Sequence, residues 1–198
     1  MLTQEIARFL LGKIISTKIN GFLTSGIIVE TEAYLGEIDM AAHSYLNHHT
    51  QRNDALFKKA GTIYVYQMRG YFLLNIVTKN NFSECVLIRS IEPIKGIDIM
   101  EKRRKFPYKK FQLTNGPCKL CQALSIDLSF NNSFINEKLF LTLNSDFIPK
   151  KIEITPRIGI FNKGNWTNKK LRYFVNGNPY VSKILQKEVD NVSFGWKK

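Results

Sequence analysis

Two glutamates and a tyrosine occupy alternate positions between residues 28 and 36. Side chains alternate between the faces of a strand, so Glu30, Glu32 and Tyr34 are expected on one exposed face. Paired carboxylates beside an aromatic ring suit acid–base chemistry next to a stacking surface, and they contribute little to a purely structural strand. Their Cα atoms should lie about 7 Å apart, and a single strand does not let them flank a sugar as an ordinary glycosidase requires. The structural alternative is the solvated face of an edge strand.

Other strand-like segments carry chemistry at the same spacing of two. Cys85, Leu87 and Arg89 share one face of an apolar segment. An arginine in such a strand needs a carboxylate partner, and the strand with the two glutamates offers one. Tyr64 and Tyr66 also share a face, where they are either core residues or platforms on which a nucleobase stacks.

The segments that must position these residues alternate between helix and strand patterns. Asn20-Gly21 is a strong signal for a two-residue hairpin turn. The patterns predict one α+β domain over residues 1–198, built on a largely antiparallel, curved sheet with surrounding helices, with 186–198 as a candidate disordered tail. Helices are expected at 3–11, 93–104 and 117–124, and strands at 13–19, 22–34, 62–68, 71–77, 85–89, 139–144, 152–160 and 171–175.

Composition points to a polyanionic partner. The chain has 198 residues and a formal net charge of +13, which attracts phosphate backbones. No signal peptide is visible and no apolar run approaches the ~20 residues that span a bilayer, so we expect a cytoplasmic protein without membrane contact. Three cysteines are too few to stabilise a chain of this length by disulfide bonds, and this number fits a reducing compartment.

Several common reaction classes lack their sequence signatures. No phosphate-binding glycine-rich loop, dinucleotide fingerprint or nucleophile elbow occurs, which disfavours NTPases, Rossmann enzymes and serine hydrolases. The Cys118–Cys121 spacing lies inside a predicted helix, and the three histidines do not complete a recognised zinc pattern. We therefore expect neither a metal nor a cofactor.

The ordered set of motifs resembles the alkyladenine-type 3-methyladenine DNA glycosylases, also called methylpurine-DNA glycosylases. The match covers nearly the whole chain, and its most specific segments are Val29–Tyr34 and Gly116–Leu124. Further matches are residues 10–13, 39–44, 52–53, 61–66, 86–89, 92–93, 157–159 and 171–175.

The resemblance implies a role for each matching residue. Glu32 would be the general base that activates water for attack on the sugar C1′, with Arg89 and the backbone carbonyl of Ile158 helping to hold that water. Tyr34, His43 and Tyr66 would form aromatic walls around a flipped base. Asn75 would disfavour the exocyclic amine of normal guanine, and Leu87 would line the same pocket.

The chain departs from the family's pattern after Tyr66. The family has a tyrosine here that fills the gap left in the duplex, whereas this chain is one residue shorter and has Arg69 at that point. Either Arg69 or Met68 takes the place of the tyrosine as the DNA-intercalating residue, or the hairpin tip is rebuilt. An arginine can stack through its planar face while it pairs with a phosphate.

The implied function is excision of damaged purines from double-stranded DNA by a monomer. The substrates would be 3-methyladenine above all, then 7-methylguanine, with hypoxanthine and ethenoadenine as neutral candidates. No lysine matches a Schiff-base nucleophile, which predicts a monofunctional enzyme without strand cleavage. Two alternatives stay open: a non-catalytic nucleic-acid-binding module, and a glycosylase-like fold inactivated by the altered hairpin.

Overall fold

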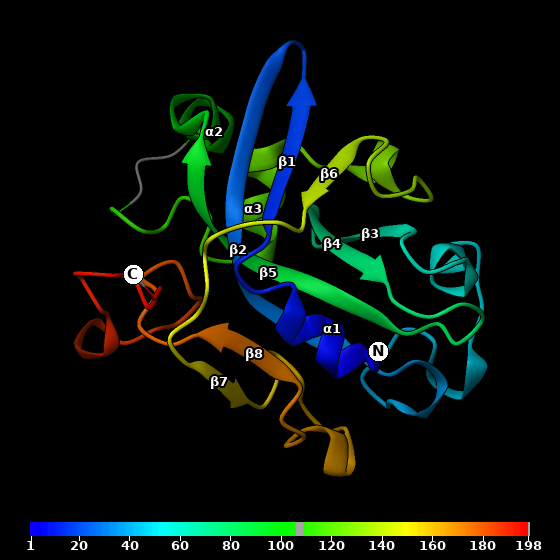
Figure 1. The fold of residues 1–198 in the computed structure, drawn as a ribbon. Helices are drawn as coiled ribbons and strands as arrows, with labels where there is room; N and C mark the ends of the chain where they lie inside the picture. The colour runs from blue at the N-terminus through cyan, green and yellow to red at the C-terminus, as the bar shows by residue number, and fades with distance from the viewer. Residues whose placement is uncertain (106–108, 198) are drawn as a thin grey trace.

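The computed structural model describes residues 1–105 and 109–197. Over this part of the chain it has three α-helices and eight strands, all paired antiparallel, which confirms a single α+β domain (Figure 1). None of these helices is long and apolar enough to cross a membrane. The elements are α1 (Thr3–Phe9), β1 (Ile14–Ile19), β2 (Phe22–Tyr34), β3 (Ile63–Met68), β4 (Tyr71–Val77), β5 (Cys85–Lys95), α2 (Ile97–Arg104), α3 (Pro117–Leu124), β6 (Leu139–Thr142), β7 (Ile152–Thr155) and β8 (Arg172–Val175).

Strand β2 is the centre of the sheet. The strand order is β3-β4-β5-β2-β1-β6, and β8 pairs with β2 beyond the end of β1, over Glu30–Glu32, with β7 outside it. Every residue of β2 from Thr24 to Ala33 is buried. The alternative of a solvated edge strand is therefore wrong, because the glutamates have hydrogen-bonded neighbours on both sides.

Helices cover both faces of this central region. In Figure 1, α1 crosses in front of β2 and β5, while α3 lies behind them. The residue contacts agree with this arrangement: α1 packs on β2, β5 and β8, whereas α3 packs on the sheet mainly at β4 and β5. The Thr31 hydroxyl donates to the Ala7 carbonyl of α1 at 2.8 Å, so alternation directs Glu30 and Glu32 to the opposite face.

The helix expected at 93–104 begins later than predicted. Strand β5 runs on to Lys95, which pairs with Ser25, and Gly96 turns the chain at φ 70° before α2. Met100 is buried, but Ile97 is 41% exposed. Pairing with β2 outweighs the local helical pattern at the start of this segment. The basic tract 102–110 includes the end of α2, and its residues 106–108 lie outside the described residues.

The C-terminal segment packs on the domain as far as the structure describes it, to residue 197, contrary to the expected disordered tail. Trp196 is only 7% exposed, and its ring contacts Phe147 with centroids 5.6 Å apart. The Trp196 indole donates to Glu92 at 2.9 Å, and a backbone bridge joins it to Pro149. Burial of the indole supplies the hydrophobic gain that a polar tail lacks.

Candidate active site

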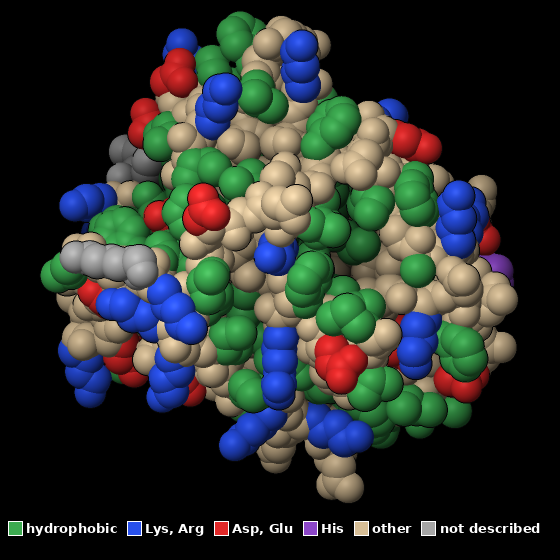
Figure 2. Space-filling view, in the orientation of Figure 1, with side chains coloured by type: hydrophobic (Ala, Val, Ile, Leu, Met, Phe, Trp, Pro, Cys, Tyr) green, Lys and Arg blue, Asp and Glu red, His purple; other side chains and the backbone are tan. Residues whose placement is uncertain are grey.

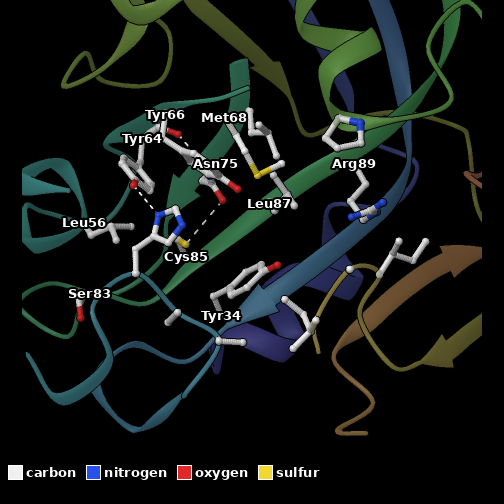
Figure 3. A pocket seen from close by; sticks show the side chains of 18 residues that line it. Tyr34, Leu56, Tyr64, Tyr66, Met68, Asn75, Ser83, Cys85, Leu87 and Arg89 are labelled. Carbon is white, nitrogen blue, oxygen red and sulfur yellow. Dashed lines mark hydrogen bonds between the residues drawn. The ribbon is translucent and has the colours of Figure 1, made fainter. Parts of the chain in front are cut away.

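A cavity of about 370 Å³ lies where β2, β3, β4 and β5 meet the first residue of α3 and the loop after β7. Figure 3 shows side chains from these strands pointing into one space, with Tyr34 facing Met68 and Leu87 across it. Aromatic and aliphatic walls with a few polar groups are typical of small-ligand sites. Eight residues predicted from the sequence line it: Tyr34, His43, Tyr66, Met68, Asn75, Leu87, Arg89 and Ile158.

Glu32 lies directly behind this lining and is fully buried. One carboxylate oxygen, Oε1, accepts from the Ile158 N–H at 2.8 Å and lies 3.1 Å from Nη1 of Arg89. The other, Oε2, accepts from the Tyr34 hydroxyl at 2.9 Å. The expectation of an exposed carboxylate is wrong, but all three partners of Glu32 are cavity residues. At Ile158, the atom that contacts Glu32 is the N–H.

Glu30 differs from Glu32 in the number of its partners. Its carboxylate accepts from Nε of Arg172 at 2.6 Å and Nε of Arg89 at 3.1 Å. Ser90 Oγ adds a bond of 2.9 Å, and the Ser182 N–H and hydroxyl add two of 2.8 Å. Burial raises the pKa of Glu30, but the two guanidiniums and the Ser182 N–H outweigh it and leave the pKa below its ordinary value. With five donors around it, Glu30 is a structural charge.

Arg89 joins the two carboxylates because β5 bulges at this residue. Glu30 pairs with Ser90 and Thr31 pairs with Ile88, so Arg89 has no partner across the ladder. A bulge redirects its side chain, and here the guanidinium reaches both glutamates. Burial lowers the pKa of Arg89, but the carboxylates of Glu32 and Glu30 raise it further, and the net shift is upward. The pairing of this arginine with the glutamate strand is confirmed.

The aromatic side chains form a connected group on one side of the cavity. The rings of His43 and Tyr66 meet edge to face, with centroids 4.5 Å apart, and Tyr66 stacks on Tyr64 at 5.5 Å. Nδ1 of His43 lies 2.7 Å from the Tyr64 hydroxyl. Burial, followed by the charge of Arg52, lowers the pKa of His43, so its imidazole is neutral near pH 7.

The Tyr34 ring lies apart from this group, with an open face toward the cavity. Burial and the nearby Glu32 charge raise the pKa of Tyr34 well above its usual value. Its hydroxyl therefore stays protonated and donates to Glu32. Sequence reasoning predicted Tyr34 as an aromatic wall but did not predict this hydrogen bond.

The amide of Asn75 is held in a fixed orientation at the cavity wall. Its Nδ2 donates to the Tyr64 carbonyl at 3.1 Å, and the Cys85 thiol lies 3.8 Å from its Oδ1. Leu87, on the same face of β5 as Cys85, completes this wall. A fixed amide can discriminate between purines by their edge substituents, because an unmatched donor loses its hydrogen bond.

The ion pair between Asp39 and Arg157 was not predicted. Nη1 of Arg157 lies 2.5 Å from Oδ2 of Asp39, and Nη2 lies 2.9 Å from Oδ1. Both residues stood inside family-like motifs, but nothing local paired positions 118 residues apart. Within the described chain, the buried charged side chains are three carboxylates and three guanidiniums, all in this region: Glu30, Glu32, Asp39, Arg89, Arg157 and Arg172.

Met68 and Arg69 occupy different positions at the tip of the β3–β4 hairpin. Arg69 and Gly70 form the turn with φ of 50° and 82°, and Arg69 lines a separate surface pocket instead of the cavity. Met68 lines the cavity and is 48% exposed, as is Tyr71, its pair in the ladder. A solvent-exposed apolar pair therefore stands beside the cavity, with a cationic side chain at the turn.

Positive charge is concentrated on part of the protein surface. Lysine and arginine side chains gather on the lower part of the face in Figure 2, over the segment with β7 and β8. In residues 1–105 and 109–197, no group of three or more His, Cys, Asp or Glu side chains is placed to hold a metal ion. The chemistry on offer is that of a carboxylate, a guanidinium and an aromatic-walled cavity.

Comparison with known proteins gives a consistent result. Residues 2–179 match the model of the family described as methylpurine-DNA glycosylase (MPG). A protein of Lactiplantibacillus plantarum, provisionally named a 3-methyladenine DNA glycosylase, is 50% identical over 98% of this chain and 93% of its own length. One from Enterococcus faecalis with the same provisional name is 45% identical over 98% of this chain and 86% of its own length. A protein of Encephalitozoon cuniculi, named a probable DNA-3-methyladenine glycosylase, is 40% identical over 97% of this chain and 94% of its own length.

Proposed function

The chain belongs to the methylpurine-DNA glycosylase family and is a DNA-repair hydrolase, and from this premise we propose how it acts. It extrudes an alkylated purine from duplex DNA, binds it in the cavity and hydrolyses its N-glycosidic bond, leaving an abasic site. The base cannot be cut while it is stacked, and extrusion costs a few kcal/mol. The substrates are 3-methyladenine and 7-methylguanine, whose ring nitrogens carry the added methyl group.

One observation supports this mechanism most: a fully buried carboxylate, Glu32, whose two hydrogen-bond donors, Tyr34 and Ile158, and ion-pair partner, Arg89, all line the cavity. In the proposal Glu32 takes a proton from water as the water attacks C1′ of the flipped nucleotide. Its negative charge stabilises the oxocarbenium-like sugar, and Arg89 fixes its position at 3.1 Å. Glu30 cannot act as this base, because its carboxylate already accepts five hydrogen bonds from protein donors.

The cavity walls support the choice of a cationic purine. Alkylation at a ring nitrogen makes the base positive and a better leaving group, and aromatic faces attract it by about 0.5–2 kcal/mol. Tyr34, Tyr66 and the neutral His43 are the proposed walls. Asn75 is proposed to reject the amine of unmodified guanine. Selectivity then depends on charge, on a weakened glycosidic bond and on loose pairing.

At the hairpin tip, Met68 is the better candidate to fill the space left in the duplex. It lies at the rim and lines the cavity, whereas Arg69 sits at the turn beyond it. In the proposal Arg69 instead contacts a phosphate.

The test is release of free 3-methyladenine from methylated duplex DNA by the purified protein, with undamaged duplex as the control. We expect base release from the damaged duplex alone, without strand cleavage. A non-catalytic binder would show salt-dependent affinity and no release, and would not prefer a cationic pyrrolidine abasic analogue over intact duplex. An inactivated glycosylase would prefer the analogue yet leave the lesion intact. Either result would refute the proposal.

A further inference from the structure

A buried ion pair lies against one face of the Tyr34 ring. Cζ of Arg157 is 4.5 Å from the ring centroid, and the side chains of Arg157 and its partner Asp39 are both 0% exposed. Two bonds of 2.5 and 2.9 Å hold the guanidinium on the carboxylate. Cation, ring and carboxylate therefore form one packed unit.

The guanidinium covers the face of Tyr34 that a base cannot reach. Tyr34 lines the cavity, whereas Arg157 does not, although Ile158 and Gly159 beside it do. Because the guanidinium lies over the ring at one face, only the opposite face is left for a stacked base. A base in the cavity and Arg157 would be separated by the thickness of one aromatic ring.

Asp39 is fixed in this position independently of Arg157. Its carboxylate also accepts from the N–H of Leu35 at 3.1 Å and from the N–H of Ala41 at 2.9 Å. It thereby ties the end of β2 to the loop that carries Ala41, Ala42 and His43 into the cavity wall. A rigid carboxylate is a reliable counter-charge, because it does not move when the cavity fills.

The buried charges of the region are balanced. The three carboxylates and three guanidiniums in the described chain sum to zero, and Asp39 is the only carboxylate that contacts Arg157 within 4.0 Å among these residues. Neutralising Asp39 would therefore leave a full positive charge directly behind the stacking ring. A cationic base on the other face would be repelled, and a neutral base of the same shape would not.

From this geometry we infer that Asp39 is a specificity-determining residue. By cancelling the charge of Arg157 behind Tyr34, it allows the open face of the ring to accept a positively charged purine. The inference rests on the proposed function, since it requires a flipped cationic base in the cavity.

The size of the effect follows from Coulomb's law. A base stacked on the open face would lie about 8 Å from the guanidinium, and one uncompensated charge at an effective dielectric of roughly 20 weakens its binding about thirtyfold. Solvent relaxation reduces this, so we expect about a tenfold loss that is specific to the charged base.

The experiment compares two duplexes that differ only in the charge of one base. One contains 2′-fluoro-7-methylguanosine, which is cationic, and the other contains its neutral 7-methyl-7-deaza isostere; the 2′-fluorine blocks cleavage, so equilibrium Kd values are measured. The readout is the Kd for the neutral duplex divided by the Kd for the cationic one. Because both values come from the same protein preparation, a partly unfolded variant does not distort the ratio.

Three variants give opposite expectations. Asp39→Asn should lower the ratio about tenfold, while Arg157→Met, which leaves a net negative charge behind the ring, should raise it severalfold. The double variant restores neutrality and should return the ratio to within about twofold of the wild type. A purely structural role would instead move both single variants in the same direction.

The outcomes separate this inference from the proposed function. If the wild-type protein binds neither modified duplex more tightly than an undamaged one, the proposed function fails. If it prefers the cationic duplex but Asp39→Asn and Arg157→Met leave the ratio unchanged, or shift it in one direction, the role of Asp39 is overturned. Should Asp39→Asn not fold, the rise expected for Arg157→Met and its reversal in the double variant decide the question.

Discussion

Replacing Glu30 and Glu32 one at a time by glutamine separates a structural carboxylate from a reactive one. The two residues stand on the same strand, are both 0% exposed and both contact Arg89. They differ in their other partners. Glu30 is also paired with Arg172 at 2.6 Å, whereas the remaining partners of Glu32 are a hydroxyl and an N–H.

The expected costs in free energy of unfolding follow from these partners. Glu30→Gln leaves Arg172 without a carboxylate, and breaking a buried pair costs about 3–5 kcal/mol. At about 2–4 °C per kcal/mol for a domain of this size, Tm should fall by roughly 6–20 °C. Glu32→Gln leaves Arg89 paired with Glu30 and should cost roughly 1–2 kcal/mol.

Thermal and urea unfolding followed by circular dichroism at pH 7 measure both values under the same conditions. The urea m-value serves as the control, since an unchanged m-value shows that the variants unfold from the same compact state. If Glu32→Gln destabilises the protein as much as Glu30→Gln, the division into structural and reactive carboxylates is incorrect.

Three further predictions concern the walls and rim of the cavity. Asn75→Ala should raise release of unmodified guanine about tenfold, measured by chromatography of free bases, and an unchanged rate would remove Asn75 from the selectivity argument. Arg69→Gly should raise the free energy of unfolding by about 1 kcal/mol because Arg69 has a positive φ, and it should lower the slope of log K against log salt for DNA binding by about one. Met68→Ala should weaken binding to abasic duplex without changing this slope. If Met68→Ala changes the slope and Arg69→Gly does not, the roles assigned to the two residues are exchanged. Because the pKa of His43 is lowered in the folded protein, the unfolded chain binds the proton first as pH falls, so stability is retained above pH about 6.5 and is lost below it. His43→Gln should remove this contribution to the pH dependence of the free energy of unfolding. An NMR titration that placed the pKa of His43 above 6.5 would contradict the prediction.

The strand that carries the glutamates could be predicted from the sequence, but its burial could not. Alternation and the Asn20-Gly21 turn identify β1 and β2 directly. What buries Glu30 is a strand some 140 residues later: Arg172 and Ser182 reach it from β8 and the segment that follows. Pairing between distant segments leaves no local pattern, so a period of two predicts a shared face without predicting what covers it.

The site shows the same division between local and distant information. Eight residues of the cavity wall were predicted because their short motifs resemble those of a family, whereas the Asp39–Arg157 pair was missed because neither local sequence indicates a partner 118 residues away. Likewise, Trp196 stands in a polar tail, and only its contacts with distant residues such as Phe147 and Glu92 show that the tail packs on the domain. A tryptophan in such a tail is the one signal that could have indicated docking.

The most direct test of the role of Glu32 is single-turnover excision of 3-methyladenine by Glu32→Gln, with binding of a pyrrolidine abasic duplex measured on the same preparation. The cavity and its hydrogen-bond acceptor are retained, so we expect the duplex to bind while base release falls to the level without protein. Release within about threefold of the wild-type rate would show that no proton passes to this carboxylate, and the mechanism built on it would be wrong.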